Sequence, residues 1–187
     1  MTIASETPGD LVADGVPELL PHLRAATLRL LTAVLRLSDG ELAVPARSAL
    51  GTRRHVVARM ARRAERRTRE IDGDDVAAPP ADRLLELAPA DLVAALTSAL
   101  GGALGALQEH AGAMRSATDE ARRASAHALD HLAWLELSHV DLDAGYDMHD
   151  VPDSSLDAIA EHFRLARSAS PEGDPSAASP FAPLMAA

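Results

Sequence analysis

Leucine and alanine recur at helical spacing along most of this chain, while aromatic residues are almost absent. Trp134, Tyr146, Phe163 and Phe181 are the whole aromatic set among 187 residues. Alanine and leucine are strong helix formers, and small alanine side chains let helix axes approach closely. The residue enrichment that is typical of strands is missing. The sequence therefore predicts a single all-α domain, long enough to bury a substantial core.

The apolar stripes predict four long helices and a shorter fifth one. Pro17 opens the first helix, Ser38-Asp39-Gly40 ends it, and Thr52 is placed to cap the second. The expected helices cover residues 17–37, 52–71, 90–107, 118–142 and 152–167. They form a bundle over residues 16–167, between tails 1–15 and 168–187 that we expect to be disordered.

Three glycines, Gly101, Gly102 and Gly105, interrupt the third expected helix. Each costs about 1 kcal/mol relative to alanine in a helix interior. Close contact with a neighbouring helix is the usual compensation, and a bend near a ligand cavity is the alternative.

Charge and composition exclude several classes of protein. The formal net charge of −10 argues against a nucleic-acid partner, because neutralising phosphates needs a basic face. No cysteine is present, so disulfides and thiolate sites are excluded. We find no apolar run near the roughly 18 residues that span a membrane, and no signal peptide, so we expect a cytoplasmic protein. All basic residues are arginine, which indicates a high-GC organism such as an actinomycete.

The second expected helix carries a crowded arginine face. One interpretation is a solvated face whose arginines pair with acids on a neighbouring helix. The other is an anion-binding edge for a carboxylated ligand. The arginines concerned are Arg53, Arg54, Arg62, Arg63, Arg66, Arg67 and Arg69.

Two stretches resemble the N-terminal domain of mycothiol-dependent maleylpyruvate isomerases. One is the Gly-Thr-Arg-Arg-His-Val-Val-Ala-Arg-Met-Ala-Arg run over 51–62. The other is Ser-His-Val-Asp-Leu-Asp-Ala-Gly-Tyr over 138–146, and Leu-Ser-Asp over 37–39 is a further echo. The resemblance implies a DinB-like four-helix bundle with a short additional C-terminal helix. It also implies one divalent metal, held by His, Glu and His, that activates a thiol such as mycothiol.

The positions of the family's three metal ligands fall on Arg59, Trp134 and Ser138. Arginine is a permanent cation, tryptophan only donates, and a lone serine hydroxyl is a poor ligand. We therefore expect no metal and no cofactor.

A relocated metal site is the alternative. It would use the four histidines His55, His127, His131 and His139. His127 and His131 are spaced one helical turn apart, which suits a shared metal. Whether His55 reaches them depends on the relative direction of the second and fourth helices, which we expect to be antiparallel.

Among the three replaced ligand positions, Arg59 is the strongest candidate for a functional residue. It either pairs structurally with an acid or binds a substrate anion. His55 or His139 would then move a proton, although His55 also fits a helix-start histidine bonded to the backbone. We expect Trp134, Ser138 and Asp141 to line the substrate pocket. The alternative for Trp134 is that it only fills the core. The alternative for His139 and Asp141 is that they tie the end of the helix to a loop.

We therefore expect a metal-independent relative of this family that binds a small anionic molecule and transforms it by isomerisation, cyclisation or addition. Actinomycete specialised metabolism is a plausible setting. One alternative is a non-catalytic dimeric binding or accessory protein, since Ala-rich bundles often form homodimers. The other is a mycothiol-dependent metal-containing transferase with relocated ligands. We expect no membrane partner.

Overall fold

The computed structural model describes residues 16–48, 50–74, 81–113 and 119–169. The expected N-terminal tail, and residues 170–187 of the expected C-terminal tail, lie outside the described residues.

The described part of the chain is all-α, as the sequence predicts, and contains no strand. The five expected helices are present, with ends shifted by a few residues. Two short helices, α3 and α5, lie in segments that sequence periodicity left unassigned or as loops. The helices are α2 (Val16–Leu35), α3 (Asp39–Leu42), α4 (Arg53–Asp72), α5 (Ala81–Leu85), α6 (Pro89–Ala113), α7 (Asp119–Leu142) and α8 (Asp153–Ala169).

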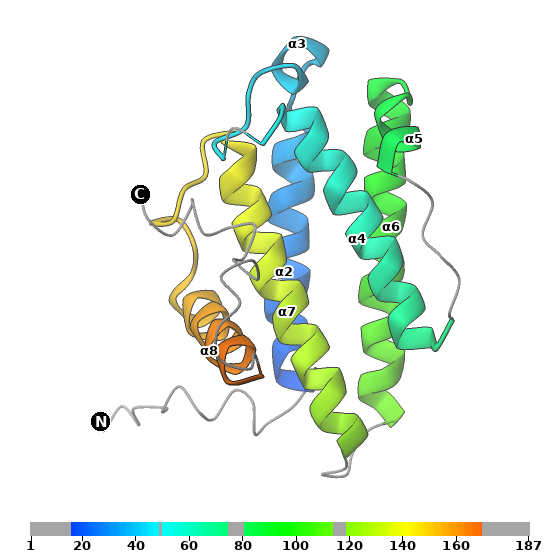
Figure 1. The fold of residues 1–187 in the computed structure, drawn as a ribbon, viewed down its shortest axis with the longest axis vertical. Coiled ribbons are helices and arrows are strands. Elements are labelled where there is room, and N and C mark those ends of the chain that lie inside the picture. Colours follow the sequence, from blue (N-terminus) through cyan, green and yellow to red (C-terminus); the bar gives the residue numbers. More distant parts are fainter. Residues whose placement is uncertain (1–15, 49, 75–80, 114–118, 170–187) are drawn as a thin grey trace.

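The four long helices α2, α4, α6 and α7 lie side by side along the long axis of the molecule (Figure 1). Helix α4 packs most extensively on α6, while α2 packs on both α6 and α7. Helices α4 and α7 are antiparallel, because Arg59 pairs with Asp141 whereas Arg67 pairs with Asp130. Helix α8 packs against α7 from outside the four.

Helix α7 is the central element of this arrangement. It contacts α2, α4, α6 and α8, and every residue from His131 to Leu142 is buried. The leucine stripes of α2 and α6 add fully buried side chains to the core: Leu19, Leu23, Leu30, Leu92, Leu96, Leu100 and Leu107. A helix buried on all sides has no solvated face, so each polar group on α7 needs a protein partner.

Helix α6 corrects one expectation from the sequence. Its segment 89–111 is long and apolar enough, by length and composition alone, to cross a membrane. Leu92, Leu96, Leu100 and Leu107 of this segment are fully buried against the other helices. The core helix of a soluble protein passes the same test, so the finding is compatible with a soluble protein.

The α6 glycines differ in their surroundings. A Cβ atom added at Gly102 would lie 3.4 Å from the Thr68 Oγ1 atom of α4, so this glycine stands at a close contact between α4 and α6. A Cβ atom added at Gly101 or Gly105 would meet nothing within 4 Å in the described part of the chain. Close packing therefore accounts for Gly102 alone.

We expect Gly101→Ala and Gly105→Ala each to stabilise the fold by about 0.5–1 kcal/mol, because alanine loses less backbone entropy and has room here. Gly102→Ala should gain less, because its methyl group must fit against Thr68. Thermal unfolding of the three variants measures the difference. Destabilisation by Gly101→Ala or Gly105→Ala would show that another surface covers this side of α6.

Candidate functional site

Arg59 lies on the side of α4 that faces α7 and forms an ion pair there. Its guanidinium donates to Asp141 Oδ2 at 2.9 Å and to the Leu50 carbonyl at 3.1 Å. The Asp141 side chain is 2% exposed, and its Oδ1 atom accepts the Ser48 backbone N–H at 2.8 Å. Arg59 thus has the structural role that the sequence left open, and Asp141 ties the end of α7 to the loop before α4.

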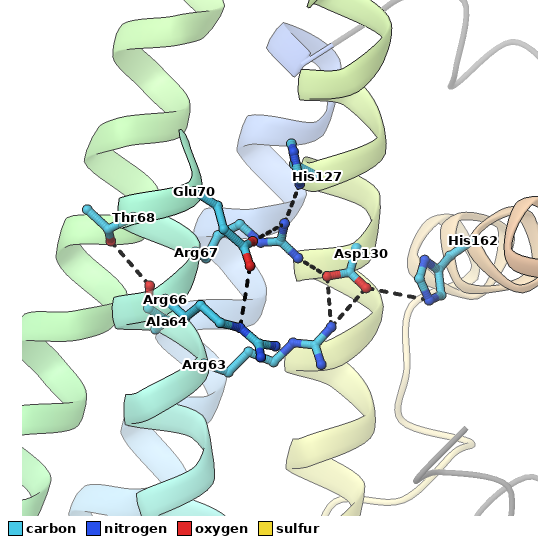
Figure 2. A network of polar contacts seen from close by, with 9 residues as sticks. All are labelled: Arg63, Ala64, Arg66, Arg67, Thr68, Glu70, His127, Asp130 and His162. Carbon is cyan, nitrogen blue, oxygen red and sulfur yellow. Dashed lines mark hydrogen bonds and ion pairs between the residues drawn. The ribbon is translucent and has the colours of Figure 1, made fainter. Parts of the chain in front are cut away.

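Further along α4, arginines surround Asp130 of α7 (Figure 2). Arg63 donates to both carboxylate oxygens of Asp130, at 2.8 and 2.9 Å, and Arg67 donates to Oδ2. His162 of α8 brings Nε2 within 3.6 Å of Oδ1, so the network joins three helices. Of the seven arginines on this face, Arg63, Arg66 and Arg67 are therefore paired with acids rather than open to a ligand.

Trp134 and Ser138, at the other two positions of the family's ligands, are buried. The Trp134 ring stacks on His131 with centroids 5.8 Å apart, and the Arg63 guanidinium lies 5.5 Å from its centroid. Trp134 therefore fills the space between α4 and α7, the reading that the sequence analysis gave as its alternative.

His55 caps its own helix. Its Nδ1 atom accepts the Thr52 backbone N–H at 3.2 Å and lies 2.9 Å from Thr52 Oγ1. A Cβ atom at Gly51, where φ is +123°, would come within 2.9 Å of the His55 ring, so this cap needs glycine. The structure thus places His55 in the helix-start role.

The four histidines of the alternative metal site are not brought together. His55 stands at the start of α4, while His127 contacts Arg67 near the other end of this helix. Within the described residues, no three His, Asp or Glu side chains are arranged to hold a metal ion.

His139 belongs to a different cluster, on the side of α7 that faces α2. Its ring stacks on Tyr146 with centroids 3.8 Å apart and planes 6° from parallel. The Tyr146 hydroxyl donates to Glu136 Oε2 at 2.7 Å, and Arg29 of α2 donates to Oε1 at 2.5 Å. Glu136 is only 1% exposed, so these two donors satisfy a carboxylate that would otherwise be buried unpaired.

The turn after α7 brings Tyr146 back onto His139. Asp143 has φ +53° and Gly145 has φ +82°, and this left-handed backbone reverses the chain direction within four residues. Arg47 binds the Asp143 carboxylate at 3.2 Å, and Arg53 donates to the Asp143 carbonyl. The start of α4 and the preceding loop therefore hold this turn.

A cavity of about 660 Å³ opens between α2, the start of α4 and this turn. Its volume falls in the usual range for small-molecule sites. It is lined by Leu28, Arg29, Thr32, Ala33, Arg36, Leu37, Glu41, Arg53, His139, Asp143, Ala144, Gly145 and Tyr146. Of the residues that the sequence suggested for a site, His139 lines this cavity, and Arg59, His55, Trp134, Ser138 and Asp141 do not.

Two arginines in the lining, Arg36 and Arg53, have no carboxylate within ion-pair distance among the described residues. Arg29 is neutralised by Glu136, and Asp143 is paired with Arg47. The Glu41 carboxylate accepts hydrogen bonds from Ser38 at 2.6 and 2.8 Å, within the cap of α3. Glu41 keeps its negative charge and interacts with Arg53 through space, so Arg36 and Arg53 together leave a small positive excess in the cavity of a protein of net charge −10.

Burial holds the imidazoles in their neutral form. Burial and then the nearby Arg29 charge lower the pKa of His139 to about 4. Burial and the Arg67 charge lower the pKa of His131 to about 3. Burial and the hydrogen bond to Glu136 raise the pKa of Tyr146 far above its usual value, so its hydroxyl stays a donor. At neutral pH the positive charge of the cavity therefore comes from its arginines and not from His139.

Sequence reasoning missed Arg29, Arg36 and Glu136. Arg29 and Arg36 are seven residues apart, a spacing that puts two residues on one face of a helix, and Arg36 directly follows the last residue of α2. The partner of Arg29 lies 107 residues away in the chain, and no local pattern indicates such a pair.

Comparison of the chain with protein-family models, curated proteins and solved structures finds no match. The resemblance to maleylpyruvate isomerases accordingly stays a prediction from its motifs.

We expect the free energy of unfolding to fall as the pH drops from about 6.5 towards 4. The unfolded chain takes up protons on its histidines in this range, whereas His131 and His139 do so only near pH 3 and 4. Each of the two histidines lowers the free energy of unfolding by up to about 1.4 kcal/mol for each pH unit in this range. Urea unfolding at pH 7, 6 and 5 measures the slope, and His131→Leu should reduce it. An unchanged slope in this variant would contradict the assignment.

Proposed function

We propose that this protein binds a small organic anion in the cavity between α2 and the C-terminal turn of α7, without a metal. The observation that carries the proposal is the pair of guanidinium groups, Arg36 and Arg53, that line the cavity without a carboxylate partner among the described residues. Arginine presents several fixed donors that match a carboxylate, and it remains charged at any physiological pH.

The surroundings of Arg53 support a ligand site, whereas the Arg36 side chain is exposed at the cavity. Arg53 is half-buried, and its position is set by the hydrogen bond that it donates to the Asp143 carbonyl. An anion that enters the cavity therefore meets a preorganised positive charge at reduced solvent screening.

The proposal keeps the ligand class that the sequence suggested and moves the site. Arg59 and Asp141 neutralise each other between α4 and α7, whereas Arg36 and Arg53 remain available. Isomerisation, cyclisation or addition at this site would need a group that moves a proton. His139 is the imidazole in the cavity lining, and its lowered pKa of about 4 leaves it a neutral but weak base at pH 7.

We expect Arg36→Gln and Arg53→Gln each to weaken the binding of benzoate by about three- to tenfold, and the double variant by more, because each removes a charge-assisted hydrogen bond. Binding to the wild-type protein should also weaken as the salt concentration rises. Isothermal titration calorimetry with benzoate at two salt concentrations measures both effects.

Arg62→Gln is the matched control, because Arg62 is an exposed arginine of α4 outside the cavity lining. It should leave benzoate affinity unchanged. Equal losses in Arg62→Gln and Arg53→Gln would indicate a general effect of net charge and would overturn the proposed site. Benzoate binding that depends on Arg59 and not on Arg36 or Arg53 would return the site to the position of the family's metal.

A further inference from the structure

We infer that the ligand is an elongated amphipathic monocarboxylate, with its head group at Arg36 and Arg53 and its apolar chain along α2 towards Leu28. This inference rests on the proposed function and specifies the class of anion. It follows from how the lining residues are distributed along the cavity.

Helix α2 and the turn that follows it, in which the Arg36 and Leu37 N–H groups donate to the Ala33 and Val34 carbonyls, form one wall of the cavity with two neighbouring rows of side chains. One row is Leu28, Thr32 and Arg36, and the other is Arg29, Ala33 and Leu37. Residues four apart stand one above the other on a helix, so the rows run along its axis. From Leu28 to Leu37 the wall is roughly 13 Å long at 1.5 Å per residue. The site is therefore long enough for an extended chain.

The net charge lies at one end of this wall. Arg36 stands near the C-terminal end of α2, close to the start of α4 that carries Arg53. Arg29 stands two helical turns earlier, but Glu136 neutralises it at 2.5 Å. An anionic head is therefore stabilised at the Arg36 end and gains little at the Leu28 end.

The rest of the lining is suited to an apolar chain. Leu28 is 68% exposed at the cavity, whereas few other large apolar side chains in the described part of the chain are exposed. Ala33 and Ala144 leave space, and the Tyr146 ring offers an apolar surface, since its hydroxyl is already bonded to Glu136. Covering Leu28 with an alkyl chain would remove this apolar surface from water.

Carboxylates at the cationic end favour a single negative charge on the ligand. Glu41 and Asp143 both line the cavity near Arg53. Asp143 is paired with Arg47, whereas Glu41 has no ion-pair partner among the described residues, so a second anionic group on the ligand would be repelled by Glu41, which costs free energy. A monocarboxylate therefore fits better than a dicarboxylate.

Titration of the intact protein with acetate, butyrate, hexanoate and octanoate tests the inference, with 1-octanol as the uncharged control. We expect affinity to rise about two- to fourfold per methylene group, since each buries additional apolar surface. Octanol should bind at least tenfold more weakly than octanoate, and suberate, the dicarboxylate of the same length, should also bind more weakly.

Leu28→Ser should make affinity rise less steeply with the chain length of the carboxylate. Acetate affinity should not change, because acetate has no chain that reaches Leu28. Leu35→Ser is the matched control, because Leu35 is also 68% exposed on α2 but does not line the cavity. A flat chain-length series whose binding still needs Arg36 and Arg53 would overturn this inference and keep the proposed function. Octanol binding as tight as octanoate, or octanoate binding independent of both arginines, would overturn the two together.

Discussion

The fold depends on neutralising the carboxylates of α7. Because this helix is surrounded by α2, α4, α6 and α8, its acids have little contact with water. Arginines on two neighbouring helices provide the countercharge. From α4, Arg59 binds Asp141, and Arg63 with Arg67 binds Asp130, whereas from α2, Arg29 binds Glu136. Removing one member of such a pair leaves a charge that is buried without a partner, which costs several kcal/mol.

This pairing divides the arginines into two groups with different consequences. The arginines that bind α7 hold the helices in register, and the carboxylates of α7 neutralise their charge. Arg36 and Arg53 line the cavity, and no carboxylate in the described part of the chain binds them. The excess positive charge of the cavity is thus a local property, in a chain whose overall charge is −10. The proposed binding of a small anion rests on this local charge, whereas the overall charge argues against a polyanion such as nucleic acid.

The helices could be predicted from the sequence because their apolar stripes are long and regular, whereas α3 and α5 are too short to show periodicity. Residues two apart on a helix point about 200° apart, which separates Trp134 from Glu136. In the structure, Trp134 lies against Arg63 of α4, and Glu136 binds Arg29 of α2. The candidate site was less predictable. Local sequence does not show which acid an arginine meets across the bundle, so Arg59 was indistinguishable from an arginine that is free to bind a ligand.

The single tyrosine and the single tryptophan of the chain allow one direct test, because Tyr146 lines the cavity and Trp134 lies between α4 and α7. Fluorine NMR of protein labelled with fluorotyrosine and fluorotryptophan gives one resonance for each position. On titration with octanoate, the account predicts a saturable shift of the Tyr146 resonance and an unchanged Trp134 resonance. A saturable shift of Trp134 with Tyr146 unchanged would place the ligand where the resembling family holds its metal and would contradict the account.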